Sequence, residues 1–213
     1  MKFCVIGLGR FGRQVATLLA ENGMEVLAID SNEAIIASIR DQVTQAVCMR
    51  VSDDKSLRSI GVDEMDTVIV GMGENFAQSI LITALLKKRL DIPRVIARAI
   101  NDIHKEILKI VGADKVILPE QEIGIKVADN LSSPFTDLIR LTKDYSVSQA
   151  VTPLRFVGKK ISELNLFEQY GVHYIGIKEA DTIITLDPDY SIQEQDKLLL
   201  AGHNKNLEKI AKL

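Results

Sequence analysis

The first 120 residues alternate short apolar runs with segments in which apolar residues recur at helical spacing. The apolar runs, which we expect to be strands, cover residues 2–7, 25–30, 44–49, 66–71, 93–98 and 115–118. The segments expected to be helices cover residues 10–22, 53–60, 74–90 and 102–111, with a further helix capped by Ser31 or Asn32. The strands are apolar throughout, as in parallel sheets covered by helices on both faces. The pattern predicts an α/β fold with a Rossmann-like, doubly wound parallel sheet over residues 1–120.

The pattern changes after residue 120. Residues 120–142 have the pattern of one long helix, which Pro134 in the pair Ser133-Pro134 could break because proline lacks a backbone N–H. Strand-like segments then cover residues 145–152, 172–177, 182–186 and 197–201, with a helix expected at 161–169. We therefore predict a linking helix over residues 121–143, followed over residues 144–213 by a small C-terminal α/β domain with a mostly antiparallel sheet.

Composition and charge narrow the range of functions. The formal net charge of −3 over 213 residues argues against a nucleic-acid partner, which requires a basic face. No apolar stretch approaches the roughly 20 residues of a membrane span, and the first strand begins at once, so no signal peptide is expected. Cys4 and Cys48 both lie in apolar runs, so we expect two buried, reduced thiols in a cytoplasmic protein.

The most specific motif is the turn GLGRFG at residues 7–12, which follows a strand and opens a helix. In this context Gly7 permits a tight turn, Gly9 lets the backbone approach a pyrophosphate, and Gly12 lets the helix pack closely on the strand. Asp30 ends the second strand, where a carboxylate accepts hydrogen bonds from ribose hydroxyls and repels the 2′-phosphate of NADP. The alternative is a turn whose glycines serve packing alone, with Asp30 capping the next helix.

Further ligand contacts are expected at the carboxyl ends of the other strands, where crevices open in such sheets. The candidate cofactor-binding residues are Gly7, Gly9, Arg10, Phe11, Gly12, Asp30, Arg50, Gly71 and Arg98, and the candidate metal ligand is Glu120. Arg10 inside the phosphate turn favours a ligand with terminal phosphate charge, although a solvated surface arginine fits equally well. Arg98 could reach phosphate or cap a helix. Glu120 could hold a divalent ion bound to phosphates, or serve only as a favourable charge at a helix N-terminus.

The sequence shows no catalytic constellation. His104 is expected on a surface helix, His173 in a C-terminal strand and His203 in a turn. The C-terminal segment also lacks an obvious proton donor for a hydride transfer. We therefore expect a binding protein and not an enzyme, with a small NAD-dependent oxidoreductase as the alternative. A redox-sensing repressor is a third hypothesis, but it needs a basic helix-turn-helix segment that this acidic chain does not offer.

Several segments together resemble the regulator of K⁺ conductance (RCK) family, of the TrkA/KtrA type. They are the opening KFCVIGLGRFGRQVATLLAENGMEVLAID, then DTVIVGMGEN, VIARA, GADKVILPE, FVGKKISEL and the closing DKLLLAG. Their order and the two-domain layout extend over nearly the whole chain. The resemblance implies a cytosolic nucleotide-binding regulatory subunit, commonly an octameric ring of dimers, that gates a membrane potassium channel of the TrkH/KtrB kind.

The resemblance also implies ligands. Family members bind ATP, ADP, NAD⁺ or NADH, of which we expect ATP or ADP first and NAD(H) second. Arg10 would meet the terminal phosphate of ATP, Asp30 the ribose, and Glu120 a Mg²⁺ or Ca²⁺ ion beside the phosphates of a dimer. After the third strand many relatives carry Asp or Asn followed by Ala and Thr, whereas this chain has Arg50, which could stack on adenine or add phosphate charge. Some relatives bind cyclic di-AMP in the C-terminal domain, and no motif in this tail decides that question.

Overall fold

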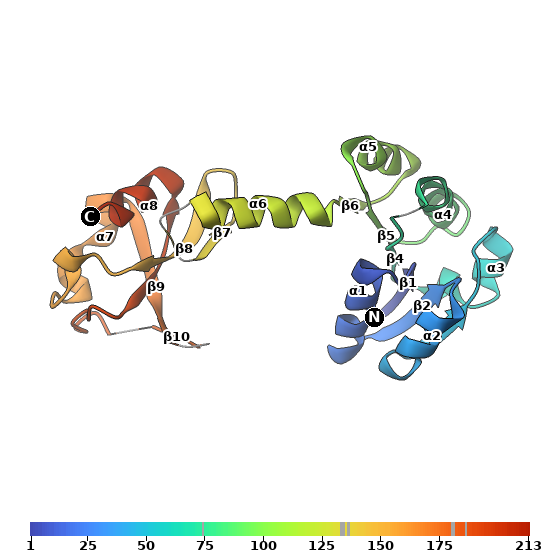
Figure 1. The fold of residues 1–213 in the computed structure, drawn as a ribbon, viewed down its shortest axis with the longest axis horizontal. Coiled ribbons are helices and arrows are strands. Elements are labelled where there is room, and N and C mark those ends of the chain that lie inside the picture. Colours follow the sequence, from blue (N-terminus) through green and yellow to red (C-terminus); the bar gives the residue numbers. More distant parts are fainter. Residues whose placement is uncertain (74, 133–134, 136, 180–181, 186) are drawn as a thin grey trace. The chain divides into compact units, whose positions relative to one another are not determined.

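The computed structural model describes residues 1–213 apart from residues 74, 133–134, 136, 180–181 and 186. The chain forms two compact units, Met1–Gln121 and Glu122–Leu213 (Figure 1). Each unit has its own sheet and its own hydrophobic core.

The first unit is built on a six-stranded parallel sheet in the order β3-β2-β1-β4-β5-β6. Its strands are β1 (Lys2–Ile6), β2 (Glu25–Asp30), β3 (Gln45–Cys48), β4 (Thr67–Val70), β5 (Arg94–Arg98) and β6 (Lys115–Ile117). Each of them lies within a range that the apolar pattern predicts. The strand order reverses between β1 and β4, and in doubly wound sheets a crevice opens at the carboxyl ends of such a pair.

Helices cover both faces of this sheet because its strands are apolar on both sides. The helices are α1 (Arg10–Glu21), α2 (Glu33–Ile39), α3 (Asp54–Arg58), α4 (Phe76–Lys88) and α5 (Asp102–Val111), and the 3₁₀ turns are η1 (Arg40–Gln42) and η2 (Val62–Glu64). Val5 shares one core cluster with Ile36 of α2, and its neighbour Ile6 shares the opposite cluster with Leu86 of α4. Of the two predicted caps, Asn32 caps α2, because its side chain accepts from the first amides of that helix.

The second unit is built on a five-stranded antiparallel sheet in the order β10-β9-β11-β8-β7. The strands are β7 (Asp137–Arg140), β8 (Tyr145–Val151), β9 (Val172–Glu179), β10 (Thr182–Ile184) and β11 (Lys197–His203). The helical elements are α6 (Pro119–Ser132), which begins in the first unit, then η3 (Leu154–Phe156), η4 (Ile161–Leu164), α7 (Leu166–Tyr170) and α8 (Asn204–Ala211). Leu207 and Ile210 of α8 lie in one core cluster with Val172 and Leu198 of the sheet.

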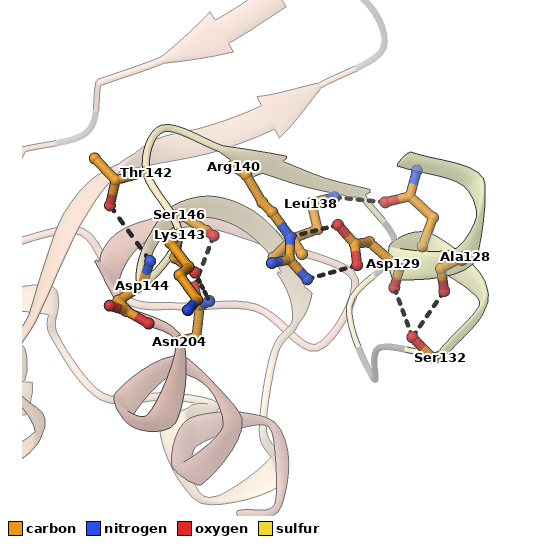
Figure 2. Close-up of polar contacts among 11 residues, drawn as sticks. Ala128, Asp129, Ser132, Leu138, Arg140, Thr142, Lys143, Asp144, Ser146 and Asn204 are labelled. Atoms are coloured by element: carbon orange, nitrogen blue, oxygen red, sulfur yellow. Dashed lines mark hydrogen bonds and ion pairs between the residues drawn. The ribbon is translucent and has the colours of Figure 1, made fainter. Parts of the chain in front are cut away.

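The prediction of one helix over residues 120–142 was wrong in its second half. Helix α6 ends at Ser132, and residues 137–140 form the edge strand β7, so residues 121–143 are not one linking helix. The strand pairs with β8 and is tied to α6 by the ion pair between Arg140 and Asp129 (Figure 2). The local apolar pattern does not report such non-local pairing. The expected break at Ser133-Pro134 lies outside the described residues.

Other expectations about the second unit were only partly right. The helix expected at residues 161–169 is two short pieces, η4 and α7, separated by Asn165 in the left-handed conformation with φ of 41°. Helix α8 was not predicted at all. Its residues are mostly polar, and its apolar stripe is only long enough to cover part of one sheet face.

Two expectations about burial were also wrong. His104 was expected on a surface, but α5 packs against α4 (Figure 1), and the fully buried ring lies 4.4 Å from the ring of Phe76 between centroids. Cys48 was expected to be buried, but it is exposed at the end of the edge strand β3, whereas Cys4 is buried as predicted. In the part of the chain that the structure describes, no helix combines the length and apolarity that crossing a membrane requires.

Candidate functional site

The three glycines of the turn between β1 and α1 have different surroundings. Gly7 has a φ of 89°, and a Cβ on it would lie 2.9 Å from the backbone nitrogen of Met72. A Cβ on Gly12 would lie 1.9 Å from the carbonyl oxygen of Gly7, so α1 packs too closely on the turn for any side chain. A Cβ on Gly9 would meet nothing within 4 Å. Gly7 and Gly12 therefore permit close packing, and Gly9 leaves its backbone open to a ligand.

The first turn of α1 carries amide groups without a side-chain cap. Its N-cap residue is Gly9, and no side chain accepts a hydrogen bond there. The helices α2, α4 and α5 are instead capped by Asn32, Asn75 and Asn101. Because the first amides of a helix have no partner within the helix and lie at its positive end, the start of α1 is suited to an anion.

Asp30 at the end of β2 is joined to the glycine turn. Its Oδ2 accepts a hydrogen bond of 2.7 Å from the backbone N–H of Leu8, and its Oδ1 accepts one of 2.9 Å from that of Asn32. The carboxylate thus holds the turn and the start of α2 together. A carboxylate has about four acceptor positions, so two remain for ligand hydroxyls.

One cleft of about 1430 Å³ in the first unit brings nearly all of the predicted site residues together. Those that line it are Gly7, Gly9, Arg10, Phe11, Asp30, Arg50, Gly71, Arg98 and Glu120. Gly12 does not line the cleft, because it packs beneath the turn. Ligand pockets usually measure about 300–1,000 Å³, so this cleft has room for a dinucleotide or a nucleoside triphosphate.

The charged side chains of the cleft are mostly cationic. Arg10 and Arg50 are exposed, and neither makes a hydrogen bond or an ion pair within the described residues. Arg98 is different, because its Nη2 donates a hydrogen bond of 2.5 Å to Oε1 of Glu120. The backbone N–H of Glu120 and the Arg98 guanidinium hold the pKa of the Glu120 carboxyl below its ordinary value. Two unpaired guanidiniums make the cleft attractive to a polyanion such as a polyphosphate.

The glycines after β4 also serve close packing. A Cβ on Gly71 would lie 2.8 Å from the carbonyl oxygen of Gly7, so β1 and β4 approach closely at the crevice. A Cβ on Gly73 would lie 2.1 Å from Nη1 of Arg98. Gly73 therefore makes the space that the Arg98 guanidinium occupies.

Sequence reasoning missed about half of the cleft lining. The missed residues include Gln14, Ser31, Asn32, Ile35, Met49, Asn75, Gln78 and Ile100. Asn75 accepts a hydrogen bond of 3.0 Å from the Gln78 backbone, and the Gln78 side chain donates one of 2.8 Å to the Val51 carbonyl. An Asn followed three residues later by Gln, just after a strand end, was the signal that could have located this pair.

The protein groups alone do not form a metal centre. Among the described residues, no three His, Cys, Asp or Glu side chains lie close enough together to hold an ion. Glu120 offers the oxygen ligand that Mg²⁺ and Ca²⁺ prefer, but it is a single carboxylate and is paired with Arg98. An ion at Glu120 would need most of its ligands from phosphates and water.

Comparison with known proteins identifies the family of the chain. Residues 3–119 match the TrkA-N domain and residues 150–213 match the TrkA-C domain. The chain belongs to the TrkA family. This TrkA-family chain is 36% identical over 210 residues to the Ktr system potassium uptake protein A of Bacillus subtilis (strain 168), covering 98% of the chain and 94% of that protein. It is 31% identical over 213 residues to the Ktr system potassium uptake protein C of the same organism, covering 99% and 96%.

Solved structures agree with the fold. A structure of the GsuK channel bound to NAD has a TM-score of 0.70 at 19% identity, covering 99% of this TrkA-family chain and 39% of that chain. A structure of GsuK bound to ADP has a TM-score of 0.52 at 25% identity, covering 61% and 33%. The chain thus spans between a third and a half of the GsuK chains that it matches. The predicted Rossmann-like domain, the small C-terminal domain and the family resemblance are confirmed.

Proposed function

We propose that the protein is a nucleotide-binding regulatory subunit of potassium transport, which acts on a membrane potassium channel subunit of the TrkH/KtrB kind from the cytoplasmic side. The observation that carries the proposal is the cationic cleft at the glycine turn, in a chain that is similar over 98% of its length to a Ktr potassium uptake protein. The relatives are potassium uptake proteins, so the oxidoreductase alternative gains no support from them.

The proposed ligand is an adenine nucleotide, ATP or ADP first and NAD(H) second. The open backbone at Gly9 and the uncapped first turn of α1 would receive phosphates, and Asp30 would accept from ribose hydroxyls. The unpaired guanidinium of Arg10, which lines the same cleft, favours a ligand with terminal phosphate charge over a dinucleotide. NAD remains the second choice because the glycine turn and the ribose acid serve both kinds of ligand.

The proposed cation is a Mg²⁺ or Ca²⁺ ion that accompanies ATP. Glu120 would hold it as one oxygen ligand, and ATP phosphates would supply the others. The ion would neutralise phosphate charge at the mouth of the cleft. Arg98 contacts Oε1 of Glu120, so Oε2 is the oxygen that would serve the ion while the pair is intact.

A homo-oligomer, and specifically an octameric ring assembled from dimers, is the proposed form of the protein. Exposed apolar side chains on the outer faces of α4 and α5 support this: Leu81 is 47% exposed, Ile103 72% and Ile110 80%. Helix α6 has no buried residue, and Ile123, Ile125, Val127 and Leu131 are exposed on it. Apolar surfaces of this kind mark protein contacts. A ligand that binds one ring shape more tightly than another would shift the ring toward it.

Two measurements test the proposal. Calorimetry on the purified chain with ATP, ADP, NAD⁺ and NADH, each with and without Mg²⁺, should show binding of at least one of them and rank the ligands. Light scattering coupled to size-exclusion chromatography should show an assembly larger than a monomer at micromolar concentration. A chain that binds none of the four ligands, or that is monomeric with and without nucleotide, would contradict the proposed function.

A further inference from the structure

The ion pair between Arg98 and Glu120 lies inside the proposed nucleotide cleft. Arg98 ends β5, and Glu120 is the second residue of α6. Their contact of 2.5 Å joins a guanidinium that is 20% exposed to a carboxylate that is 68% exposed. Both side chains line the cleft, so the pair would face the ligand.

The guanidinium of Arg98 is held in place but has few hydrogen-bond acceptors around it. Gly73 packs against Nη1, and Nε is buried without a hydrogen-bond partner among the described residues. Among the residues that the structure describes, Glu120 is the only side chain that accepts a hydrogen bond from this guanidinium. An arginine side chain carries five N–H donors in a fixed fork, so this one can gain hydrogen bonds from a phosphate that offers several oxygens.

We propose that Glu120 is an internal competitor of the nucleotide phosphates for Arg98, and that it weakens the binding of a ligand whose phosphates reach this guanidinium. The inference rests on the proposed nucleotide function. A phosphate that reaches Arg98 displaces a carboxylate that already neutralises it, so part of the gain from the new contact is offset.

The displaced residue belongs to the helix that continues into the second unit. At its far end, α6 is fixed within that unit, since Arg140 donates a hydrogen bond of 2.6 Å to Oδ1 of Asp129 and Leu138 N–H donates one of 3.0 Å to the Asn130 side chain (Figure 2). In the described part of the chain, the bond to Arg98 is the only side-chain hydrogen bond that α6 makes with the first unit. Releasing Glu120 therefore removes this bond from the first turn of α6 and leaves the other end of the helix attached.

The test is the effect of Glu120→Gln on nucleotide affinity with EDTA present, so that no divalent ion takes part. Calorimetry with ATP and ADP should show tighter binding by the variant, by about fivefold, because an exposed ion pair contributes up to roughly the corresponding free energy. Glu122→Gln is the matched control, since Glu122 is exposed on the same helix and does not line the cleft. Glu120→Ala serves as a second variant. In an Arg98→Gln background, Glu120→Gln should have no effect, which completes a double-mutant cycle.

Hydrogen exchange gives a second measurement. Nucleotide should raise the exchange rates of the amides of residues 123–126 in the native chain, and Glu120→Gln should show raised rates without nucleotide. If the native chain binds nucleotide but Glu120→Gln leaves the affinity unchanged or lowers it in EDTA, the proposed competition is wrong. The proposed nucleotide site would not be contradicted by that result. If neither ATP, ADP nor NAD⁺ binds any of the proteins, the nucleotide function itself is wrong.

Discussion

The two units contain clefts of very different character. In the first unit, the parallel strands all end on one edge of the sheet, and a cleft of about 1430 Å³ there gathers three arginines from distant parts of the sequence. The second unit has an antiparallel sheet whose strand ends alternate, and its cleft of about 370 Å³ is lined by Phe167, His173 and a single charged residue, Glu168. In this chain the parallel sheet brings several charged side chains to one cleft, and the antiparallel sheet brings one to its cleft.

Polar side chains serve the second unit in a different way. Asp129 and Arg140 tie α6 to β7, and the Ser146 hydroxyl donates a hydrogen bond of 2.7 Å to Asn204 at the start of α8 (Figure 2). These contacts join elements of the unit to one another. The first unit thus offers a charged cleft, and the second unit holds one end of α6.

The largest expected effect separates packing from binding within the glycine turn. Gly12→Ala should destabilise the first unit by about 3 kcal/mol, because the new Cβ would clash with the Gly7 carbonyl. Gly9→Ala is the control, since its Cβ would meet open space; it should leave the thermal transition unchanged and weaken nucleotide binding. Differential scanning calorimetry and ligand titration measure the two effects. Equal loss of stability in both variants would contradict the division of roles.

The next effect concerns ligand recognition by the first unit. Asp30→Ala should lower the affinity for ATP and for NAD⁺ by about tenfold or more, because hydrogen bonds to a charged acceptor contribute roughly 1.5–3 kcal/mol each. Asp30 also holds the turn, so circular dichroism should first show that the variant is folded. In the native chain NADP should bind more weakly than NAD⁺. Equal affinities for the two would rule out Asp30 as the ribose acceptor.

A smaller effect is expected in the second unit, where charge supports structure. Asp129→Asn removes one charge of the pair with Arg140 and should lower the melting temperature of this unit by a few degrees. Nucleotide affinity of the first unit should not change. Asp137→Asn is the control, because Asp137 lies on the same strand as Arg140 and makes no ion pair within the described residues. A large loss of nucleotide affinity in Asp129→Asn would contradict the view that this ion pair supports only the structure of the second unit.

The smallest effect is a pH dependence of stability that comes from His104. Burial lowers the pKa of His104 below its ordinary value of 6.5. As the pH falls below 6.5, the unfolded chain therefore binds a proton at this histidine that the folded chain does not bind. Stability should therefore decrease from neutral pH toward that lowered value. His104→Leu should reduce this slope, measured as melting temperature against pH. An unchanged slope in His104→Leu would assign the pH dependence to other groups.

The candidate site was easier to predict than the fold of the second unit. Strand ends of a parallel sheet meet at one edge by topology, so a strand pattern was enough to bring Asp30, Arg50, Arg98 and Glu120 together. The edge strand β7 and helix α8 were missed because each depends on partners far away in the chain. The pairing of Arg98 with Glu120 was also missed, since both were predicted separately as ligand contacts.

The sequence by itself determined the turn, the parallel sheet and the family, because glycine spacing and apolar runs are local and have local causes. Only the tertiary structure decided which glycines pack and which one is open, because the gap between Gly12 and Gly7 depends on how α1 lies on the sheet. It also decided that His104 is buried and Cys48 exposed, since burial depends on which face of an element is covered. The partner of Arg98 was decided in the same way, because an arginine pairs with whatever acceptor the folded chain places within its reach.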